Sequence, residues 1–271
     1  MSSENGNGST RYRGPASSEP PVNGAGSHAA TGAESEEAFS AAETPASAAA
    51  TAPRTGGRTS RSSHPLQVLI VGAGFSGLCL GYHLRRDGIE NFAILEKAEG
   101  LGGTWRDNSY PGACCDVTSL SYCFSFAQKT DWSRKWSPQP EILAYMQECA
   151  ERFDLMRHIR FGSEVASAAF DEERGVWMVT TASGEQLEAR YLVSGVGQLH
   201  RPFVPEIEGA DSFGGIMFHS ARWRHDVDLT GKRVAVIGNA ASAIQFIPEV
   251  ARSAGRVLVF QRTPNLSLIH I

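Results

Sequence analysis

The sequence predicts an α/β protein in which two strand–turn–helix units are joined by a β-meander. Three observations lead to this prediction. An apolar run rich in β-branched residues leads into a glycine-rich turn at residues 72–77, and a second such run leads into a related turn at residues 238–243. Three short segments with the composition of strands lie between the two turns. Strands that alternate with helical patterns are typical of sheets with parallel strands.

Residues 1–64, which precede the first unit, belong to a separate compositional class. They contain no Leu, Ile, Trp or Cys and only one Val and one Phe, while Ser, Ala, Gly, Glu, Thr and Pro dominate. Such a segment cannot bury enough apolar surface to offset the entropy lost on ordering. We therefore expect residues 1–64 to form a disordered tail.

The apolar segment that follows the tail, Leu66–Leu84, comes after Arg58 and Arg61 and has the outline of a secretory signal. Gly72, Gly74 and Gly77 interrupt it, and it carries Tyr82 and His83, so a strand, a turn and a helix are the better interpretation. No other stretch approaches the ~18 apolar residues that a membrane span needs. We expect a cytoplasmic protein without a membrane span.

The first unit begins with a strand at Gln67–Val71, which leads into a GxGxxG turn and a helical pattern. In such a turn the first glycine allows a tight bend, the second lets the backbone approach a pyrophosphate, and the third lets helix and strand pack closely. The helix N-terminus then faces the anion. The residues of the predicted nucleotide turn are Gly72, Gly74, Phe75, Ser76 and Gly77.

A second strand, Asn91–Leu95, ends in Glu96, which lies 22 positions after Gly74. The dinucleotide fingerprint has an acidic residue about 20 residues further on, where it accepts hydrogen bonds from a ribose. Strand, turn, helix and acid in register therefore predict a nucleotide site. The alternative is a glycine-rich turn that serves packing alone.

The second unit has a strand at Arg233–Ile237, a turn of the form GxAxxA, and a helix to about Arg252. The final alanine is tolerated in dinucleotide turns, whereas the methyl group of the middle alanine lies where the pyrophosphate must approach. We expect this methyl group to weaken the affinity of the second turn for its dinucleotide. The candidate binding residues of this turn are Gly238, Ala240, Ser242 and Ala243.

A further strand, Arg256–Phe260, is followed by Arg262 and Thr263, and Arg262 stands 22 positions after Ala240, where the first unit has Glu96. A carboxylate suits a free ribose diol and repels a 2′-phosphate, whereas an arginine binds a 2′-phosphate through its charge and paired donors. We expect the first unit to bind FAD or NAD and the second to bind NADPH. The alternative is that Arg262 is a solvated surface residue.

Two dinucleotide sites in one chain imply electron transfer between them, and NADPH to FAD is the usual pairing. The intervening chain predicts a helix at Glu141–Phe153 and a meander of strands at Val165–Phe170, Val176–Thr181 and Leu187–Val193. Ser194–Gly197 would return the chain to the first sheet. We expect an FAD-binding domain at residues 65–200, and a linker with the start of an NADP-binding domain at residues 201–265.

Charge and cysteine content narrow the classes of function. A net charge of −4 does not indicate a surface for nucleic acid. The five cysteines are odd in number, form no CxxC pair and have no histidines at zinc spacing. A reduced chain without a metal site is the expected result.

Several ordered motifs over residues 66–265 resemble those of Baeyer–Villiger monooxygenases, a family of class B flavin-dependent monooxygenases. The similar segments are Gly102–Trp105, Tyr110–Gly112, Asp116, Ser137–Ile142 and Gln261–Pro264. The family fingerprint FxGxxxHxxxW is present in register at Phe213, Gly215, His219 and Trp223.

One position of the fingerprint departs from the family pattern. The family has Pro or Asp after the tryptophan, whereas this chain has Arg224. Related N- and S-oxygenating flavin monooxygenases have Tyr or Phe followed by Lys. Trp223 favours the Baeyer–Villiger type, and N- or S-oxygenation remains the alternative.

The resemblance implies a two-dinucleotide-binding-domain flavoprotein, with a Rossmann-like FAD domain that includes a β-meander and a truncated Rossmann-like NADP domain. It also implies that NADPH reduces FAD, and that a C4a-peroxyflavin formed with O2 inserts one oxygen atom into a ketone or aldehyde. The substrate would be a small carbonyl compound, and the product an ester or lactone.

The same resemblance implies roles for individual residues. Asp116 would lie near the isoalloxazine as a catalytic residue, partnered by an arginine outside this sequence. Arg262 and Thr263 would hold the 2′-phosphate, and His219 would couple the fingerprint to domain movement. The residues implied to lie near the flavin are Gly103, Thr104 and Trp105.

The last six residues, 266–271, read LSLIHI, which is the translation of a DNA adapter used to prepare sequencing libraries. We expect the natural sequence to continue past Asn265, and the present chain to be inactive on its own. A non-catalytic nucleotide-binding fragment is the remaining alternative function.

Overall fold

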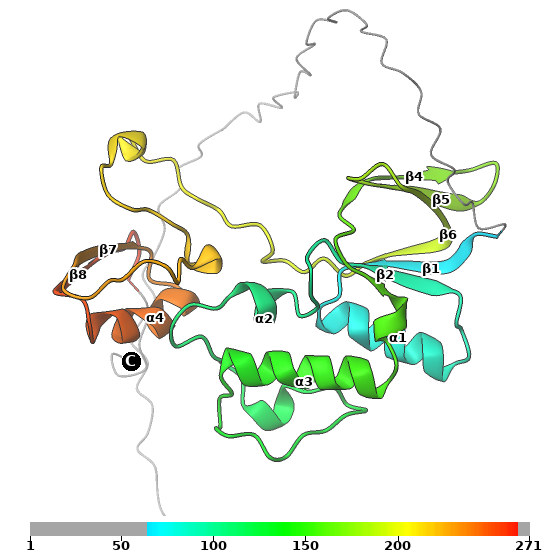
Figure 1. The fold of residues 1–271 in the computed structure, drawn as a ribbon, viewed down its shortest axis with the longest axis horizontal. Helices are drawn as coiled ribbons and strands as arrows, with labels where there is room; N and C mark the ends of the chain where they lie inside the picture. The colour runs from blue at the N-terminus through cyan, green and yellow to red at the C-terminus, as the bar shows by residue number, and fades with distance from the viewer. Residues whose placement is uncertain (1–63, 265–271) are drawn as a thin grey trace, which may run out of the picture. The chain divides into compact units, whose positions relative to one another are not determined.

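The computed structural model describes residues 64–264, which form two β-sheets (Figure 1). The expected disordered tail, apart from His64, and the expected adapter residues lie outside the described range. The first sheet has the strand order β3–β2–β1–β6–β5–β4. Its strands are β1 (Leu66–Val71), β2 (Phe92–Leu95), β3 (Ile159–Arg160), β4 (Val165–Asp171), β5 (Val176–Thr181) and β6 (Gln186–Ser194).

The parallel half of this sheet is built around β1, which pairs with β2 on one side and β6 on the other. β2 in turn pairs with β3. Because Val71 is in register with both Leu95 and Ser194, the segments that follow these three strands leave the sheet at one edge. The first glycine turn, Glu96 and Gly195 therefore meet there, which is where ligands bind in open α/β sheets.

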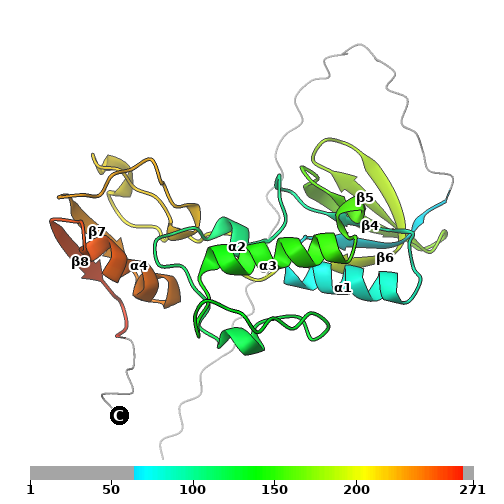
Figure 2. The ribbon, with the colours of Figure 1, turned by 60° about the horizontal axis from the view of Figure 1, so that its bottom comes forward.

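Two helices, α1 (Phe75–Arg86) and α3 (Gln139–Arg152), lie together on one face of the parallel strands (Figures 1 and 2). Side chains alternate between faces along a strand, so Val68 and Ile70 of β1 pack into the core with these helices. The intervening Leu69 packs on the other side, with residues of β5 and β6. The meander thus covers the face of β1 and β2 opposite the helices.

The predicted β-meander is present, with each strand within about two residues of its predicted limits. One feature differs. The sequence places the return to the first sheet at Ser194–Gly197, but β6 itself is already a strand of the parallel sheet, from Leu66↔Ala189 to Val71↔Ser194. This is physically consistent because the two edges of β6 bond different neighbours, β5 near its start and β1 along its later part.

The second sheet contains the parallel pair β7 (Arg233–Ile237) and β8 (Arg256–Phe260), joined through α4 (Ala241–Ala251). Val236, Phe246 and Val250 bury their side chains between strand and helix. Ile237 and Phe260 stay largely exposed. This unit therefore buries less of its apolar surface than the first.

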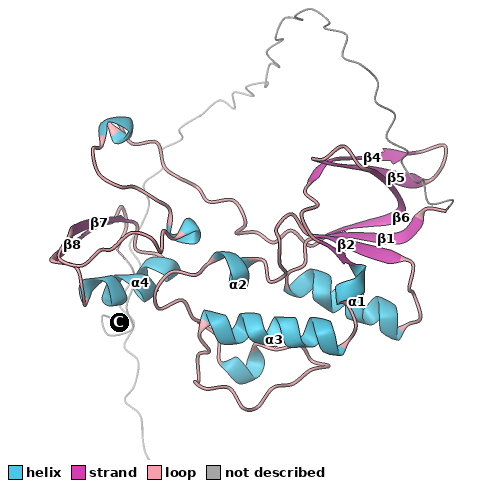
Figure 3. Ribbon diagram, in the orientation of Figure 1, coloured by secondary structure: helices cyan, strands magenta, loops and turns pink. Residues whose placement is uncertain are grey.

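The chain between β6 and β7 contains no strand and only two short 3-10 turns, at Ala210–Ser212 and Ser220–Arg222 (Figure 3). The sequence also did not predict α2 (Thr104–Asp107) or the two-residue β3. Elements this short contain too few residues to show a helical or strand period. No helix within residues 64–264 has the length and apolar character that a membrane crossing requires.

Candidate functional site

The first glycine turn closes by direct backbone contact with the end of β6. Gly72 has a φ of +104°, and a Cβ there would lie 2.6 Å from the carbonyl oxygen of Gly195. A Cβ on Gly77 would lie 2.0 Å from the carbonyl oxygen of Gly72. No side chain fits at either position without displacing backbone, so these two glycines are required by the turn itself.

The middle glycine of the turn is in a different environment. A Cβ built on Gly74 meets no atom within 4 Å, and Gly103 approaches closely, since its own Cβ would lie 3.5 Å from the Cα of Gly74. Gly74 is also the N-cap of α1 and offers no side-chain cap. The first N–H groups of an α-helix lack intrahelical partners and attract anions. The turn therefore leaves open space in front of a helix start.

The predicted ribose acceptor, Glu96, is 4% exposed and already has partners. Its Oε2 accepts a hydrogen bond from Ala73 N at 2.9 Å, and its Oε1 accepts one from Ala98 N at 3.0 Å. Arg106 Nη1 lies 3.2 Å from Oε1. A carboxylate can accept about four hydrogen bonds, so these partners orient Glu96 and still leave acceptor capacity on Oε2. Sequence reasoning missed Arg106, which has no place in the fingerprint.

The segment after Gly103 is joined to the first turn through one aromatic side chain, Tyr122. Trp105 Nε1 donates to the Tyr122 hydroxyl at 3.0 Å. The Phe75 ring packs edge-on against Tyr122, with ring centroids 5.2 Å apart. Trp105 and Phe75, both predicted binding residues, are thus held by a common neighbour. Thr104 and Ser76 are exposed.

The predicted catalytic residue, Asp116, lies on the loop between α2 and α3 and is exposed. Within the described part of the chain its carboxylate forms no hydrogen bond or ion pair that fixes its orientation. Burial raises the pKa of the neighbouring Cys114 and Cys115 thiols, and the charge of Asp116 adds to this. These thiols remain protonated at neutral pH, which does not favour a thiolate role.

The second turn has the same backbone shape but is more open to solvent. Gly238 has a φ of +106° and donates to Phe260 O at 2.8 Å. Ala240, the N-cap of α4, is exposed, whereas Ala243 is buried against the strand. The turn therefore has a helix start facing solvent, with a methyl group at its middle position.

Arg262 and Thr263 are exposed at the end of β8, on a loop that is tied to the second turn. Asn239 Nδ2 donates to Gln261 Oε1 at 2.7 Å and to Thr263 O at 3.0 Å. The second position of the motif is variable, so no sequence pattern singles out Asn239. Its side chain holds the segment containing Arg262 beside the turn.

The Tyr110–Cys115 loop contacts the second unit, which the sequence did not predict. Tyr110 and Ala113 are buried in one cluster with residues of α4. Gln245 of α4 forms hydrogen bonds with Tyr110 and Cys114, and Ser242 is also hydrogen-bonded to Tyr110. The structure therefore brings Ser242, a predicted binding residue, to the loop that leads to Asp116.

The fingerprint residues are not gathered at one point. Trp223 packs against Phe246 of α4, with ring centroids 5.4 Å apart. His219 Nδ1 accepts a hydrogen bond from Ala221 N at 3.0 Å, which caps a short turn. Phe213 and Gly215 are exposed. Only Trp223 of the four reaches the core of the second unit.

Arg224, the position that departs from the fingerprint, pairs locally with Asp226, at 2.7 Å between Nε and Oδ1. The pair is exposed, so its contribution to stability is small. Next to it, His225 Nε2 lies 2.8 Å from Ser109 Oγ and connects the fingerprint segment to the loop before Tyr110.

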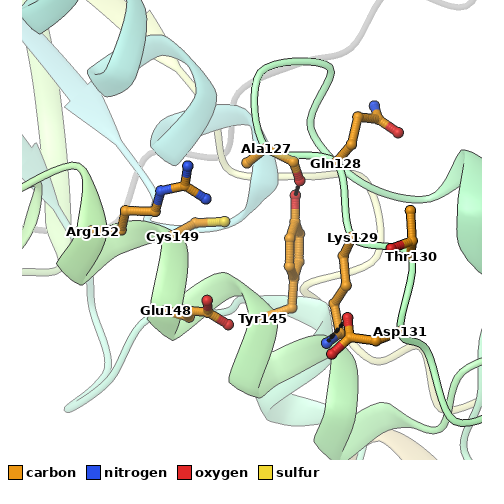
Figure 4. A pocket seen from close by; sticks show the side chains of 9 residues that line it. All are labelled: Ala127, Gln128, Lys129, Thr130, Asp131, Tyr145, Glu148, Cys149 and Arg152. Atoms are coloured by element: carbon orange, nitrogen blue, oxygen red, sulfur yellow. Dashed lines mark hydrogen bonds and ion pairs between the residues drawn. The ribbon is translucent and has the colours of Figure 1, made fainter.

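A separate pocket of about 200 Å³ lies beside α3 and is lined by none of the predicted site residues (Figure 4). Tyr145 stands at its wall and donates to Ala127 O at 2.8 Å, while accepting from Phe124 N at 2.8 Å. Burial raises the pKa of Tyr145 well above its usual range. Lys129 is neutralised by Asp131 at 2.8 Å. These hydrogen bonds and this ion pair stabilise the folded loop beside α3.

Residues 64–264 also contain no cluster of three side chains suited to a metal.

Comparison with known proteins gives a match over most of the described chain. The pyridine nucleotide-disulphide oxidoreductase family matches residues 69–269. A Baeyer–Villiger monooxygenase of Streptomyces coelicolor is 50% identical over 199 residues, covering 73% of this chain and 38% of that protein. A phenazine N-monooxygenase of Lysobacter antibioticus is 39% identical over 200 residues, covering 72% of this chain and 37% of that protein.

Solved structures give the same result. Steroid monooxygenase, in an oxidised form bound to NADP, matches with a TM-score of 0.70 and 46% identity, over 75% of this chain and 40% of that one. OTEMO in complex with FAD and NADP matches with a TM-score of 0.70 and 37% identity, over 75% of this chain and 40% of that one. The chain thus spans about two-fifths of the length of the proteins it matches. The α/β fold class and the resemblance to Baeyer–Villiger monooxygenases are confirmed.

Proposed function

The chain belongs to the pyridine nucleotide-disulphide oxidoreductase family, and on this premise we propose that it provides the FAD site and part of the NADPH site of a monooxygenase. The reaction is Baeyer–Villiger oxidation, in which one oxygen atom of O2 is inserted beside the carbonyl group of a small ketone or aldehyde. The similarity to Baeyer–Villiger monooxygenases supports this proposal.

One observation supports it more than any other: the two glycine turns have opposite charges at equivalent places. Glu96 is buried beside the first turn, and Arg262 is exposed beside the second. A carboxylate accepts hydrogen bonds from a ribose diol and repels a 2′-phosphate, while a guanidinium attracts it. Two different dinucleotides, FAD and NADPH, fit this pair of sites better than two copies of one.

The residues present fit an FAD molecule at the first turn. A Cβ on Gly74 would meet no protein atom within 4 Å, and this open space allows the pyrophosphate to approach the start of α1. Glu96 is oriented by Ala73 N and can accept from the ribose. When bound, FAD would accept electrons from NADPH and supply, with O2, the oxygen atom that is transferred.

The protein's own groups would hold and orient the reactants. Trp105, fixed by Tyr122, would line the flavin side of the site. Asp116, exposed on its loop, would orient a cationic group beside the flavin, and such fixed charges are a main source of rate enhancement. Arg262 and Thr263 would bind the 2′-phosphate. Trp223 would transmit movement of the second unit to the fingerprint segment.

The test uses the protein expressed from its complete gene and loaded with FAD. We expect NADPH to reduce the bound flavin faster than NADH does, and we expect cyclohexanone or acetophenone to yield an ester or lactone. Under 18O2, the product should contain one 18O atom. A flavoprotein that NADPH reduces, but that forms no ester or lactone across a panel of ketones and aldehydes, contradicts the proposed reaction.

N-oxygenation is the second candidate, because a phenazine N-monooxygenase is among the similar proteins. It needs the same two cofactor sites, so the first and second turns do not distinguish the two reactions. Phenazine as substrate does: an N-oxide with no ester from any ketone favours this candidate. Failure to bind FAD would favour a non-catalytic nucleotide-binding protein. The cytoplasmic location stays a prediction.

A further inference from the structure

One side chain, Gln245, joins the helix of the second unit to the loop that leads to Asp116. We infer that Gln245 is a positioning residue, which fixes the second glycine turn relative to this loop and so sets the distance between the two cofactor sites. The effect of Gln245 on the cofactor sites rests on the proposed function, whereas its contacts with the loop are seen directly in the structure.

Gln245 uses both ends of its amide group on the same loop. Its Oε1 accepts from the Tyr110 hydroxyl at 2.9 Å and from Cys114 N at 3.3 Å. Its Nε2 donates to Cys114 O at 2.9 Å. An amide that pairs with both the N–H and the C=O of one residue fixes orientation as well as distance, because each hydrogen bond is directional.

Packing around Gln245 leaves the loop little freedom to slide along α4. A Cβ on Gly112 would lie 2.7 Å from the backbone oxygen of Gln245, so the two backbones are in close contact. The Tyr110 ring packs edge-on against Phe246, with centroids 6.0 Å apart, and both side chains are buried. A shift of the loop along α4 would therefore both break hydrogen bonds and create steric clashes.

Tyr110 is a dependable donor in this arrangement. Burial raises its pKa above the ordinary value, and the hydrogen bond with Ser242 offsets this in part. The hydroxyl is therefore protonated throughout the physiological pH range. Since Ser242 lies in the first turn of α4, Tyr110 contacts the helix start as well as Gln245.

The junction, by which we mean the contacts between Gln245 and the Tyr110–Cys115 loop, lies next to both proposed sites. Cys114 is two residues before Asp116, and Gln245 is five residues after Ala240, the N-cap of α4. Hydride transfer moves one proton and two electrons from NADPH, which is oxidised, to FAD, which is reduced. A displacement of about 1 Å at such a step can lower the rate about a hundredfold. Gln245 should therefore affect the rate of hydride transfer more than the affinity for NADPH.

The experiment compares Gln245→Met with Gln147→Met. Methionine keeps the length of the side chain and removes all three hydrogen bonds, while Gln147 is an exposed residue on α3. Anaerobic stopped-flow mixing of the FAD-loaded protein with NADPH gives both the limiting rate of flavin reduction and the Kd for NADPH. We expect Gln245→Met to lower the limiting rate about tenfold to a hundredfold, with the Kd changed less than about twofold. Gln147→Met should change neither.

A second readout does not depend on cofactors or activity. Amide hydrogen exchange at Cys114 should be faster in Gln245→Met than in the wild-type chain, because its N–H loses its acceptor. Tyr110→Phe removes one of the three hydrogen bonds. Its limiting rate of flavin reduction and its exchange rate at Cys114 should lie between those of the wild-type chain and Gln245→Met. This variant replaces Gln245→Met if the latter folds poorly.

The outcomes separate this inference from the proposed function. A wild-type protein that NADPH does not reduce contradicts the proposed function, while the exchange rate at Cys114 still tests the junction. Unchanged exchange at Cys114 in Gln245→Met overturns the inference. So does a higher Kd with an unchanged limiting rate, since Gln245 would then act in cofactor binding rather than in positioning.

Discussion

The two glycine turns have the same backbone design but different surroundings. The first is enclosed, since Gly72 and Gly77 contact neighbouring backbone and Glu96 is buried beside them. The second is open, with Ala240 and Arg262 both exposed. A side-chain hydrogen bond connects each turn to the end of the next strand. It involves a buried carboxylate in the first turn and the partly buried amide of Asn239 in the second.

This difference matches what each proposed cofactor requires. A buried carboxylate with fixed partners forms a rigid site, which suits a cofactor that stays bound through many turnovers. An exposed arginine binds phosphate mainly through charge, and exposed charges are screened by water and salt. That arrangement suits a nucleotide that must bind and leave.

The largest effect is expected at Gly77. In Gly77→Ala the new Cβ would lie 2.0 Å from the Gly72 carbonyl oxygen, so backbone must move. We expect the free energy of unfolding to fall by about 3 kcal/mol, at the upper end for overpacking. Ala243→Gly, at the equivalent place in the second turn, should cost only about 1 kcal/mol. Urea unfolding measures both, and equal effects would show that the turns are enclosed alike.

An intermediate effect is expected at the middle position of each turn. Gly74→Ala adds a methyl group that meets no protein atom within 4 Å, so stability should not change. The methyl group would instead obstruct the pyrophosphate, and we expect FAD affinity to fall at least about tenfold, or 1.4 kcal/mol.

The reverse change, Ala240→Gly, removes a methyl group from the second turn and should raise NADPH affinity. Flavin fluorescence titration and NADPH binding measure the two affinities. An unchanged FAD affinity in Gly74→Ala would place the pyrophosphate elsewhere.

A more selective effect, on one nucleotide only, is expected at Arg262. Arg262→Ala removes one charge-assisted contact with the 2′-phosphate, worth about 1.5–3 kcal/mol. The KM for NADPH should rise accordingly, while the KM for NADH, which lacks this phosphate, should hardly change. Steady-state kinetics with both nucleotides gives the comparison. Equal changes for the two would mean that Arg262 does not recognise the 2′-phosphate.

Local sequence was sufficient to predict the main strands and the two turns. Runs of β-branched residues next to glycines predict β1 and β7. Spacing alone predicts Glu96 as a ribose acceptor, and this role stays a prediction. Its partner Arg106 could not be identified in this way, because a carboxylate at a strand end can bond many neighbours. The domain limits at residues 65–200 and 201–265, and the route through a C4a-peroxyflavin, stay predictions.

Long-range contacts were the main omission. Gln245 and Cys114 are 131 residues apart, and no periodicity links an amide on one helix to the backbone of a distant loop. Asn239 was missed for a related reason, since the motif leaves its position unspecified. Both residues act through side-chain amides that bond to polar groups elsewhere in the chain. Such bonds are properties of the folded chain and have no local pattern.

The place of β6 beside β1 also has a consequence for how the chain folds. β1 gains β2 as a neighbour early, but its other edge pairs with residues such as Ala189, which is 123 positions after Leu66. Contacts this distant form slowly, and an unpaired strand edge invites aggregation. During synthesis, this edge of β1 stays unpaired until most of the first unit has been made. Pulse-labelled hydrogen exchange should show that amides on this edge of β1 become protected no earlier than those of β6.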